Sequence, residues 1–516
     1  MHARPIIKRT CIACGAALYA LFAALGVQAQ SAGHVILSRA LLTALVLFFP
    51  ACALLALLLR RSQTPPLPDK KPFRASRAFL FILACYVPMF IAAYPGSFAY
   101  DVPFQLRQVF TGEYSTHHPL LHTLLLGGCV ALGRWIGNIN LGAALYSVLQ
   151  MTALAACFAA ACASVSRSCS ARAARRSTLF FALYPLHMFM AVNATKDVLF
   201  SGLFALTLAL ALEMASSLKP SRALSVSLAL CGAAMMLLRN NALYAVLVWL
   251  PLILAFMRRR GVRLAACLLF ALMVYAGANG AMKAATGAVD GDLSEMLSIP
   301  IQQMARARNL AQDRLTAEQK AAVDTLMPQE SWRLYDPTIS DPVKFEFDTQ
   351  AFKRDASGYL RAYLSIGAAC PDVYLDALLA HTVPFWYPYN TYRVSGYYLQ
   401  MGVSREQTEQ WCDFDWINQT SPLRRIVDSL SWRFGAKGAM QIPVIGYLFN
   451  TGLILWVMFF FVLREWYAGR GARFALYLLP VLLWGTFLLG PVMAGRYVYP
   501  FVCALPVMAS SPRGSA

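Results

Sequence analysis

Long apolar runs separated by short polar connections repeat along most of the chain. A run of about 20 apolar residues can cross the hydrocarbon core of a bilayer as an α-helix. Because lipid cannot satisfy unpaired backbone groups, every crossing is expected to be helical. The pattern predicts an all-α polytopic membrane protein with about twelve transmembrane helices, near residues 1–29, 40–59, 78–96, 141–165, 178–193, 198–215, 223–238, 242–257, 264–282, 440–463, 474–493 and 497–510.

One further apolar run, 120–137, admits two interpretations. If it crosses the bilayer, the next helix ends outside and places four arginines in a short outer loop, namely Arg167, Arg172, Arg175 and Arg176. Lys and Arg are instead enriched in cytoplasmic loops. The run also contains His122 and Arg134. We therefore predict that 120–137 is a helix lying in, or dipping into, the outer interface.

The short connections between the runs carry most of the basic residues, as cytoplasmic loops do. This bias places both termini in the cytoplasm and the polar segment 283–438 outside, as one large extracytoplasmic domain. A hydrophobic fraction of 58% with 14% charged residues favours an integral protein of the cell (plasma) membrane. The basic residues of these cytoplasmic loops account for the net charge of +20. The sequence contains no nucleic-acid-binding motif.

The first 77 residues form a two-helix preface that ends in a basic, Pro-rich loop. The first run has a basic start and ends in Val27-Gln28-Ala29, which resembles a signal-peptidase site. A cleaved signal peptide and a retained first helix both remain open. The rest divides into a transmembrane core, the outer segment and the last helices, at 78–282, 283–438 and 439–516.

Acidic residues are unevenly distributed, since 19 of the 25 lie in 283–438. Among the other six, Asp101 follows the helix-ending sequence Tyr94-Pro95-Gly96, within a predicted outer loop, 94–122. A carboxylate amid so much apolar sequence is costly unless it has a partner or lies at a wet boundary. Asp101 is therefore the first candidate functional residue.

Polar residues at the other predicted outer tips converge on the same face. They are His117, His118, Lys196, Asp197, Arg239, Asn240 and Arg496. The arginines could instead be interfacial anchors, and Lys196 with Asp197 could be a simple neutralising pair. His118 and His122 stand four apart, a spacing that would suit a metal on one helix face, but no carboxylate shares their turn. The sequence shows no required cofactor, although it leaves room for a divalent metal.

The outer segment 283–438 begins with helical spacing, and Thr316-Ala-Glu318 predicts a helix start. It then becomes aromatic, at Phe385, Trp386, Tyr387, Tyr389, Tyr392, Tyr397 and Tyr398. These side chains suit an interfacial belt or a wall for sugar or lipid, and the two roles are compatible. Cys370 and Cys412 are expected to form a disulfide in an oxidising compartment, unless they are free thiols too far apart to pair.

The order of these polar residues resembles that of the membrane-embedded GT-C glycosyltransferases. The shared features are an acid in the first outer loop, His-Pro residues at the start of a helix, and a second acid at the next outer tip. This superfamily includes the protein O-mannosyltransferases and the aminoarabinose transferase of lipid A. A set of short motifs is more closely similar to a bacterial multi-spanning membrane family known only as a domain of unknown function. Those motifs are YPGSFAYD, HHPLLH, NATKD, LLRNN, SIPIQQMAR (which contains Gln302) and GRYVYP. The resemblance implies a GT-C-like fold and adds Gln302 to the substrate-binding candidates.

The predicted function is transfer of a hexose or pentose from a polyprenyl-phosphate donor to a glycan, lipid or protein acceptor at the outer face. An anionic leaving group requires fixed cations, which Lys196, Arg239 and Arg496 would supply. Asp101 would be the base for the acceptor hydroxyl, and Asp197 would orient the acceptor or Lys196. Beside this enzyme, a lipid-linked-sugar flippase or secondary transporter is the alternative, because charges also mark transport paths. An assembly scaffold is a third.

Overall fold

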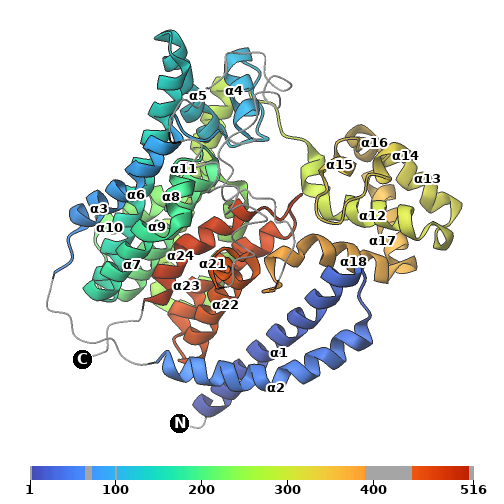
Figure 1. Cartoon of the computed structure of the whole chain (residues 1–516), viewed down its shortest axis with the longest axis horizontal. Helices are drawn as coiled ribbons and strands as arrows, with labels where there is room; N and C mark the ends of the chain where they lie inside the picture. Colours follow the sequence, from blue (N-terminus) through green and yellow to red (C-terminus); the bar gives the residue numbers. More distant parts are fainter. Residues whose placement is uncertain (1–2, 64–71, 99–100, 390–422, 424–443, 511–516) are drawn as a thin grey trace.

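The computed structural model describes residues 3–63, 72–98, 101–389, 423 and 444–510. These residues form α- and 3-10 helices, joined by isolated β-bridges (Figure 1). Six helices are long and apolar enough to cross a membrane. They are α1 (Ala3–Ala32), α2 (Leu37–Arg61), α3 (Ala75–Ala93), α6 (Ile139–Ser168), α9 (Lys196–Ser216) and α11 (Asn240–Thr286). The predicted all-α class is therefore confirmed for the described part of the chain.

The α1–α2 hairpin runs along one side of the molecule (Figure 1). Helix α1 continues unbroken through Val27-Gln28-Ala29, and Ala29 is almost fully buried in a cluster with Leu379 and Trp386. Helix α2, by contrast, exposes a long row of large apolar side chains: Leu41, Leu42, Leu45, Val46, Phe49, Leu54 and Leu57. In this structure the first helix is thus a packed part of the fold, while α2 presents an apolar surface.

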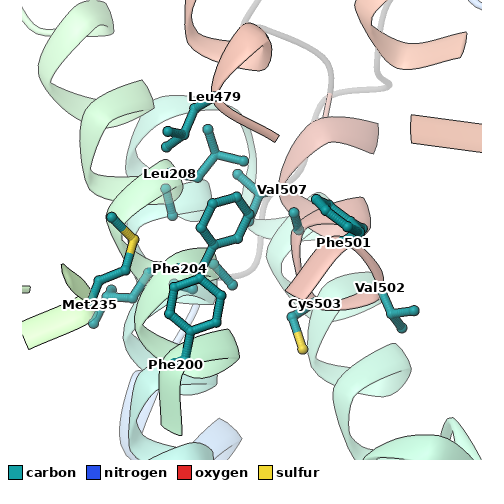
Figure 2. Packing of buried hydrophobic residues seen from close by; sticks show 14 of the residues in the cluster. Phe200, Phe204, Leu208, Met235, Leu479, Phe501, Val502, Cys503 and Val507 are labelled. Carbon is teal, nitrogen blue, oxygen red and sulfur yellow. The ribbon is translucent and has the colours of Figure 1, made fainter. Parts of the chain in front are cut away.

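Helix α9 is the centre of the main bundle, and nearly all of its residues are buried. Around it pack α6, α10 (Arg222–Leu238), α23 (Gly471–Phe487) and α24 (Tyr499–Ala509). Figure 2 shows Phe200, Phe204 and Leu208 of α9 against Phe501 and Val507 of α24. The same core also includes residues of α3, α7 (Ala171–Leu183), α8 (Pro185–Ala191), α11 and α22 (Thr451–Tyr467), the last preceded by α21 (Ile445–Phe449).

Helix α11 consists of two legs, because the backbone reverses at Arg258, whose φ of 49° lies in the left-handed region. After the reversal, Gly261 lies so close to Ile253 that a Cβ would stand 2.6 Å from its carbonyl oxygen. The two legs correspond to the separate helices predicted near 242–257 and 264–282.

Helices α4 (Asp101–Thr111) and α5 (Leu120–Trp135) follow α3 (Figure 1). Helix α5 runs antiparallel to the first part of α6: a Cβ on Gly133 would lie 2.6 Å from Cα of Gly142, while His122 contacts Tyr146 further along α6. The run 120–137 is therefore helical, as predicted, but it forms one leg of a hairpin with α6.

The end of the bundle formed by the C-terminus of α24 holds a fully buried carboxylate, Glu465. Its oxygens lie 2.7 Å from Arg464 Nη2, 3.2 Å from Arg470 Nη1 and 3.3 Å from Arg473 Nε. Arg464 also donates hydrogen bonds to the carbonyl oxygens of the last two residues of α24, at 2.7 and 3.1 Å. Arg464 belongs to α22, so these hydrogen bonds join the end of α24 to α22.

Residues after α11 form a second group of helices with its own apolar core, which includes Met304, Val323, Trp332 and Ile366. We call this group the polar-segment domain. Its elements are η1 (Leu293–Leu297), α12 (Ser298–Leu310), η2 (Gln312–Arg314), α13 (Ala317–Leu326), α14 (Gln329–Trp332), α15 (Asp341–Lys344), α16 (Thr349–Arg354), α17 (Ala356–Ala369), α18 (Pro371–Thr382) and η3 (Val383–Phe385).

The predicted start of a helix at Thr316 is confirmed, because Thr316 and Gln319 form a reciprocal capping box at α13. Phe385, Trp386 and Tyr387 are buried, whereas Tyr389 is exposed. The first three therefore serve packing. The other predicted aromatic positions, Tyr392, Tyr397 and Tyr398, lie outside the described residues.

Cys370 is buried and is the residue immediately before α18. Its predicted disulfide partner, Cys412, lies outside the described residues. The disulfide therefore stays a prediction.

Candidate functional site

Two loops from distant parts of the sequence meet at the start of α4. The Ser97 amide donates to the Val192 carbonyl at 2.9 Å, and the Ala194 amide donates back to Ser97 at 2.7 Å. Gly96 allows this approach, because its φ of 131° favours glycine and a Cβ there would stand 2.1 Å from Ser147 Oγ. The pairing brings Asp101, which begins α4, beside Lys196, which begins α9.

A buried polar network supports the same two loops. Gln150 of α6 donates to the carbonyl oxygens of Ala191 (3.1 Å) and Asn193 (2.9 Å). The Tyr146 hydroxyl lies 2.9 Å from Gln150 Oε1 and 2.7 Å from His122 Nε2. The other ring nitrogen of His122 lies 3.1 Å from Gln105 of α4. Both nitrogens of His122 are thus engaged within this hydrogen-bond network.

The residues at the predicted outer tips gather into one site, which we name the outer cluster after that prediction: Asp101, His118, Lys196, Asp197, Arg239 and Arg496. Lys196 Nζ lies 2.5 Å from Asp101 Oδ2, and Arg496 Nη2 lies 3.2 Å from Asp101 Oδ1. Arg239 pairs with Asp197, and Arg496 Nε lies 3.5 Å from Asp197 Oδ2. Three cations therefore outnumber two carboxylates, and each carboxylate is held by two of them. Arg496 joins both pairs.

Burial and charge determine the protonation of this cluster. Burial alone would raise the pKa of the Asp101 carboxyl, but Arg496 and Lys196 outweigh it and hold this pKa well below its usual range. Burial, followed by the charge of Lys196, lowers the pKa of His118 well below its ordinary value. At neutral pH Asp101 is ionised and His118 is neutral. His118 Nδ1, 3.5 Å from Lys196 Nζ, can then accept a hydrogen bond.

Aromatic rings enclose Arg239, which caps the end of α10. Its guanidinium carbon lies 4.2 Å from the ring centroid of Tyr497 and 4.5 Å from that of Phe487. Arg496 lies 5.3 Å from the same Tyr497 ring. Cation–π contacts at these distances stabilise a cation that has left water. Tyr497, in η5 (Gly495–Val498), is therefore part of the cluster, although sequence reasoning did not select it.

The remaining predicted site residues lie at the margin of the cluster or beyond it. His117 is exposed, with Nδ1 3.9 Å from Glu295 of the polar-segment domain. Asn240 is exposed at the start of α11, and its neighbour Asn241 donates to Thr486 instead. Gln302 lies in α12 and donates to the Asp336 carbonyl at 2.8 Å. Gln302 is therefore bonded within the polar-segment domain rather than to a residue of the outer cluster.

Across the described residues, no group of three or more His, Cys, Asp and Glu side chains is arranged to hold a metal ion.

The polar-segment domain contacts the loops that carry the outer cluster. Ser340 donates to the Pro491 carbonyl at 2.9 Å, a few residues before Arg496. The Gly291 amide donates to Thr116 at 3.0 Å, next to His117.

Comparison with known proteins gives a family and no function. Residues 111–511 match the model of a family of unknown function, DUF6020, so the chain belongs to this family. No curated protein and no solved structure matches the chain significantly.

Proposed function

We propose that this DUF6020 protein is a membrane-embedded glycosyltransferase of the GT-C type, which moves a sugar from a polyprenyl-phosphate donor to an acceptor at the outer membrane face. The observation that carries the proposal is the outer cluster itself. Segments around residues 101, 196, 239 and 496 contribute three cations and two carboxylates to one end of an apolar bundle. Transfer of a sugar from a phosphate leaving group requires a base and fixed cations beside it.

The membrane placement in this proposal follows from the surfaces of the helices. Apolar side chains are exposed along α2, a poor arrangement in water and a suitable one in lipid. The C-terminal ends of α6 and α9 lie together, since Arg167 Nε is 2.5 Å from Glu213. Lys196 begins α9 and therefore lies at its other end. With the basic end in the cytoplasm, the outer cluster faces outside, both termini are cytoplasmic and about twelve segments cross the plasma membrane.

This topology can be tested with reporters. A reporter fused after Arg176 is expected to be cytoplasmic, because the end of α6 and the start of α7 carry four arginines: Arg167, Arg172, Arg175 and Arg176. A reporter inserted between Glu330 and Trp332, in the polar-segment domain, is expected to be outside. Paired alkaline phosphatase and fluorescent-protein fusions measure both positions. If the two positions fall on one side of the membrane, the proposed side for the outer cluster is wrong.

The chemistry uses the ion pairs already formed. In the free protein Asp101 is the partner of Lys196 and Arg496. A donor phosphate would replace Asp101 as the partner of these cations, since phosphate oxygens accept charge-assisted hydrogen bonds in the same way. The released carboxylate would then take the proton of the acceptor hydroxyl as this oxygen bonds to the anomeric carbon. The sugar–phosphate bond breaks, its electron pair leaves with the polyprenyl phosphate, and direct displacement inverts the anomeric centre.

The interior of the bundle supports an enzyme over the transporter alternative. Between its two charged ends, α9 and α24 meet through Phe200, Phe204 and Val507 (Figure 2). A translocation path for a sugar phosphate would be expected to carry polar groups near the middle of the membrane. Within the described part of the bundle, the ion pairs around Asp101, Asp197 and Glu465 instead lie at its ends.

Lys196→Ala is expected to weaken donor binding without lowering expression, because it removes a charge-assisted contact worth about 1.5–3 kcal/mol. Arg239→Ala should also weaken donor binding. Affinity for a panel of polyprenyl-phosphate sugars, measured with purified protein in nanodiscs, provides the test. Lys219→Ala, an exposed lysine just beyond α9, is the matched control and should bind normally. If donor affinity is unchanged in both variants, the ion pairs of Lys196 and Arg239 stabilise the fold and do not bind the donor.

A further inference from the structure

Tyr497 occupies a position in the outer cluster that packing alone does not explain. Its ring lies against Arg239 and Arg496, at 4.2 and 5.3 Å, and 5.6 Å from the ring of Phe487. The side chain is only half-buried, unlike the neighbouring Arg496. The ring thus supports two cations, and part of the residue remains accessible.

The hydroxyl of Tyr497 faces the same charges. It interacts electrostatically with Arg496, Arg239, Lys196 and Asp101, and it is hydrogen-bonded with Arg239. Arginine and lysine are donors without acceptor atoms, so the phenol oxygen accepts from Arg239 and cannot give its own proton to the cations. The proton of the phenol can therefore be donated only to an acceptor, such as an oxygen of an anion that binds beside these cations.

A second tyrosine two positions later provides a contrast. Tyr499 is fully buried, and its hydroxyl lies 2.9 Å from His187 Nδ1 in the apolar core. The two phenols belong to the same short sequence, YVYP, but only Tyr497 stands among cations. The hydroxyl of Tyr499 is therefore bonded within the apolar core, whereas that of Tyr497 lies beside charged groups.

We propose that the Tyr497 hydroxyl donates a hydrogen bond to a non-bridging oxygen of the lipid-linked phosphate. It would act with Lys196, Arg239 and Arg496, which supply the charge, and it would remain bonded as polyprenyl phosphate departs. A directed donor adds stabilisation where negative charge grows during transfer. This role rests on the proposed function, because it presupposes a phosphate in the outer cluster.

Undecaprenyl phosphate is the probe, because it is the leaving group of the proposed reaction, and undecaprenol is the matched ligand without phosphate. Both are titrated into purified full-length protein in phosphatidylcholine nanodiscs. Tyr497→Phe keeps the ring against Arg239 and removes only the hydroxyl. It is expected to weaken undecaprenyl phosphate binding by about 10- to 100-fold, the range for a hydrogen bond to a charged group. Its binding of undecaprenol should not change.

Tyr499→Phe is the control for loss of a buried hydroxyl on the same segment. It is expected to lower the melting temperature while keeping the preference for phosphate over alcohol. A structural role of Tyr497 would lower stability and affect both ligands equally, which would overturn the proposal. If Lys196→Ala weakens phosphate binding and Tyr497→Phe does not, the tyrosine role fails alone. If the unaltered protein does not prefer phosphate over alcohol, the proposed function fails as well.

Discussion

Asp101→Asn is expected to fold and insert normally, to bind the lipid donor, and to transfer almost no sugar. Loss of a general base typically lowers a rate by about 100- to 10,000-fold. Asparagine preserves the shape of the side chain but cannot accept the proton of the acceptor hydroxyl. It also removes the charge that holds Lys196 and Arg496 in the free protein, at 2.5 and 3.2 Å. Donor phosphate would then meet these cations without a competing carboxylate, so donor affinity should be equal or higher.

The measurement separates turnover from binding. Transfer is followed by release of polyprenyl phosphate, and donor affinity is measured on the same preparation. Glu113→Gln is the control, because Glu113 is an exposed acid in the same region between α4 and α5. Near-normal transfer by Asp101→Asn would refute the role as base. Failure of this variant to fold would instead support a structural role.

The pH dependence of transfer provides a second observation on Asp101. The free protein holds the pKa of this carboxyl well below its usual range, so the base is ionised throughout the neutral range. Its ion pairs contribute stability above the unfolded pKa of about 3.9, which is lost as pH falls through the folded value. The acidic limb of kcat/KM, which reports the free enzyme, should therefore lie below about pH 4. With donor bound to the cations, the acidic limb of kcat should move to higher pH.

Glu465→Ala is expected to cause the largest loss of stability among these changes. Three arginines surround this fully buried carboxylate, and removing it leaves their charges together without a partner. Breaking a buried ion pair by removing one partner typically costs about 3–5 kcal/mol. The effect should extend to α24, because Arg464 also holds the last carbonyl oxygens of that helix.

Reversible unfolding in mixed micelles measures this difference. Glu213→Ala is the matched control, because Glu213 also pairs with an arginine at the same end of the bundle, and Arg167 is exposed there. Exposed ion pairs contribute about 0–1 kcal/mol. Equal losses for the two variants would show that the Glu465 cluster is not an important stabilising feature of the bundle.

The outer cluster could be predicted in part because charges are rare in apolar sequence. Asp101, Lys196, Asp197, Arg239 and Arg496 each stand out at the end of an apolar run, and the structure brings all five together. Tyr497 could not be distinguished in this way, since a tyrosine in an apolar stretch looks like any packed aromatic residue. Its adjacency to Arg496 within GRYVYP was the only available signal.

Other features could not be placed from the sequence, because spacing along the chain does not determine which surfaces meet. Gln302 was selected from a motif, yet its side chain serves the polar-segment domain. Glu465 lies between Arg464 and Arg470 in the sequence, and this spacing does not reveal that its side chain is fully buried. The run 120–137 was correctly expected to be helical, but its packing along α6 depends on the close approach of Gly133 and Gly142.

The segment from Arg496 to the end of α24 has a consequence for the depth of the site. Elements η5 and α24 contain 4 and 11 residues, which correspond to a rise of about 24 Å from end to end. The hydrocarbon core of a bilayer is about 30 Å thick. If the chain spans the membrane as proposed, the two charged ends of this segment cannot both reach the headgroups of an unperturbed bilayer. Local thinning of the lipid, or descent of the donor phosphate below headgroup level, would then be part of how this protein receives its substrate.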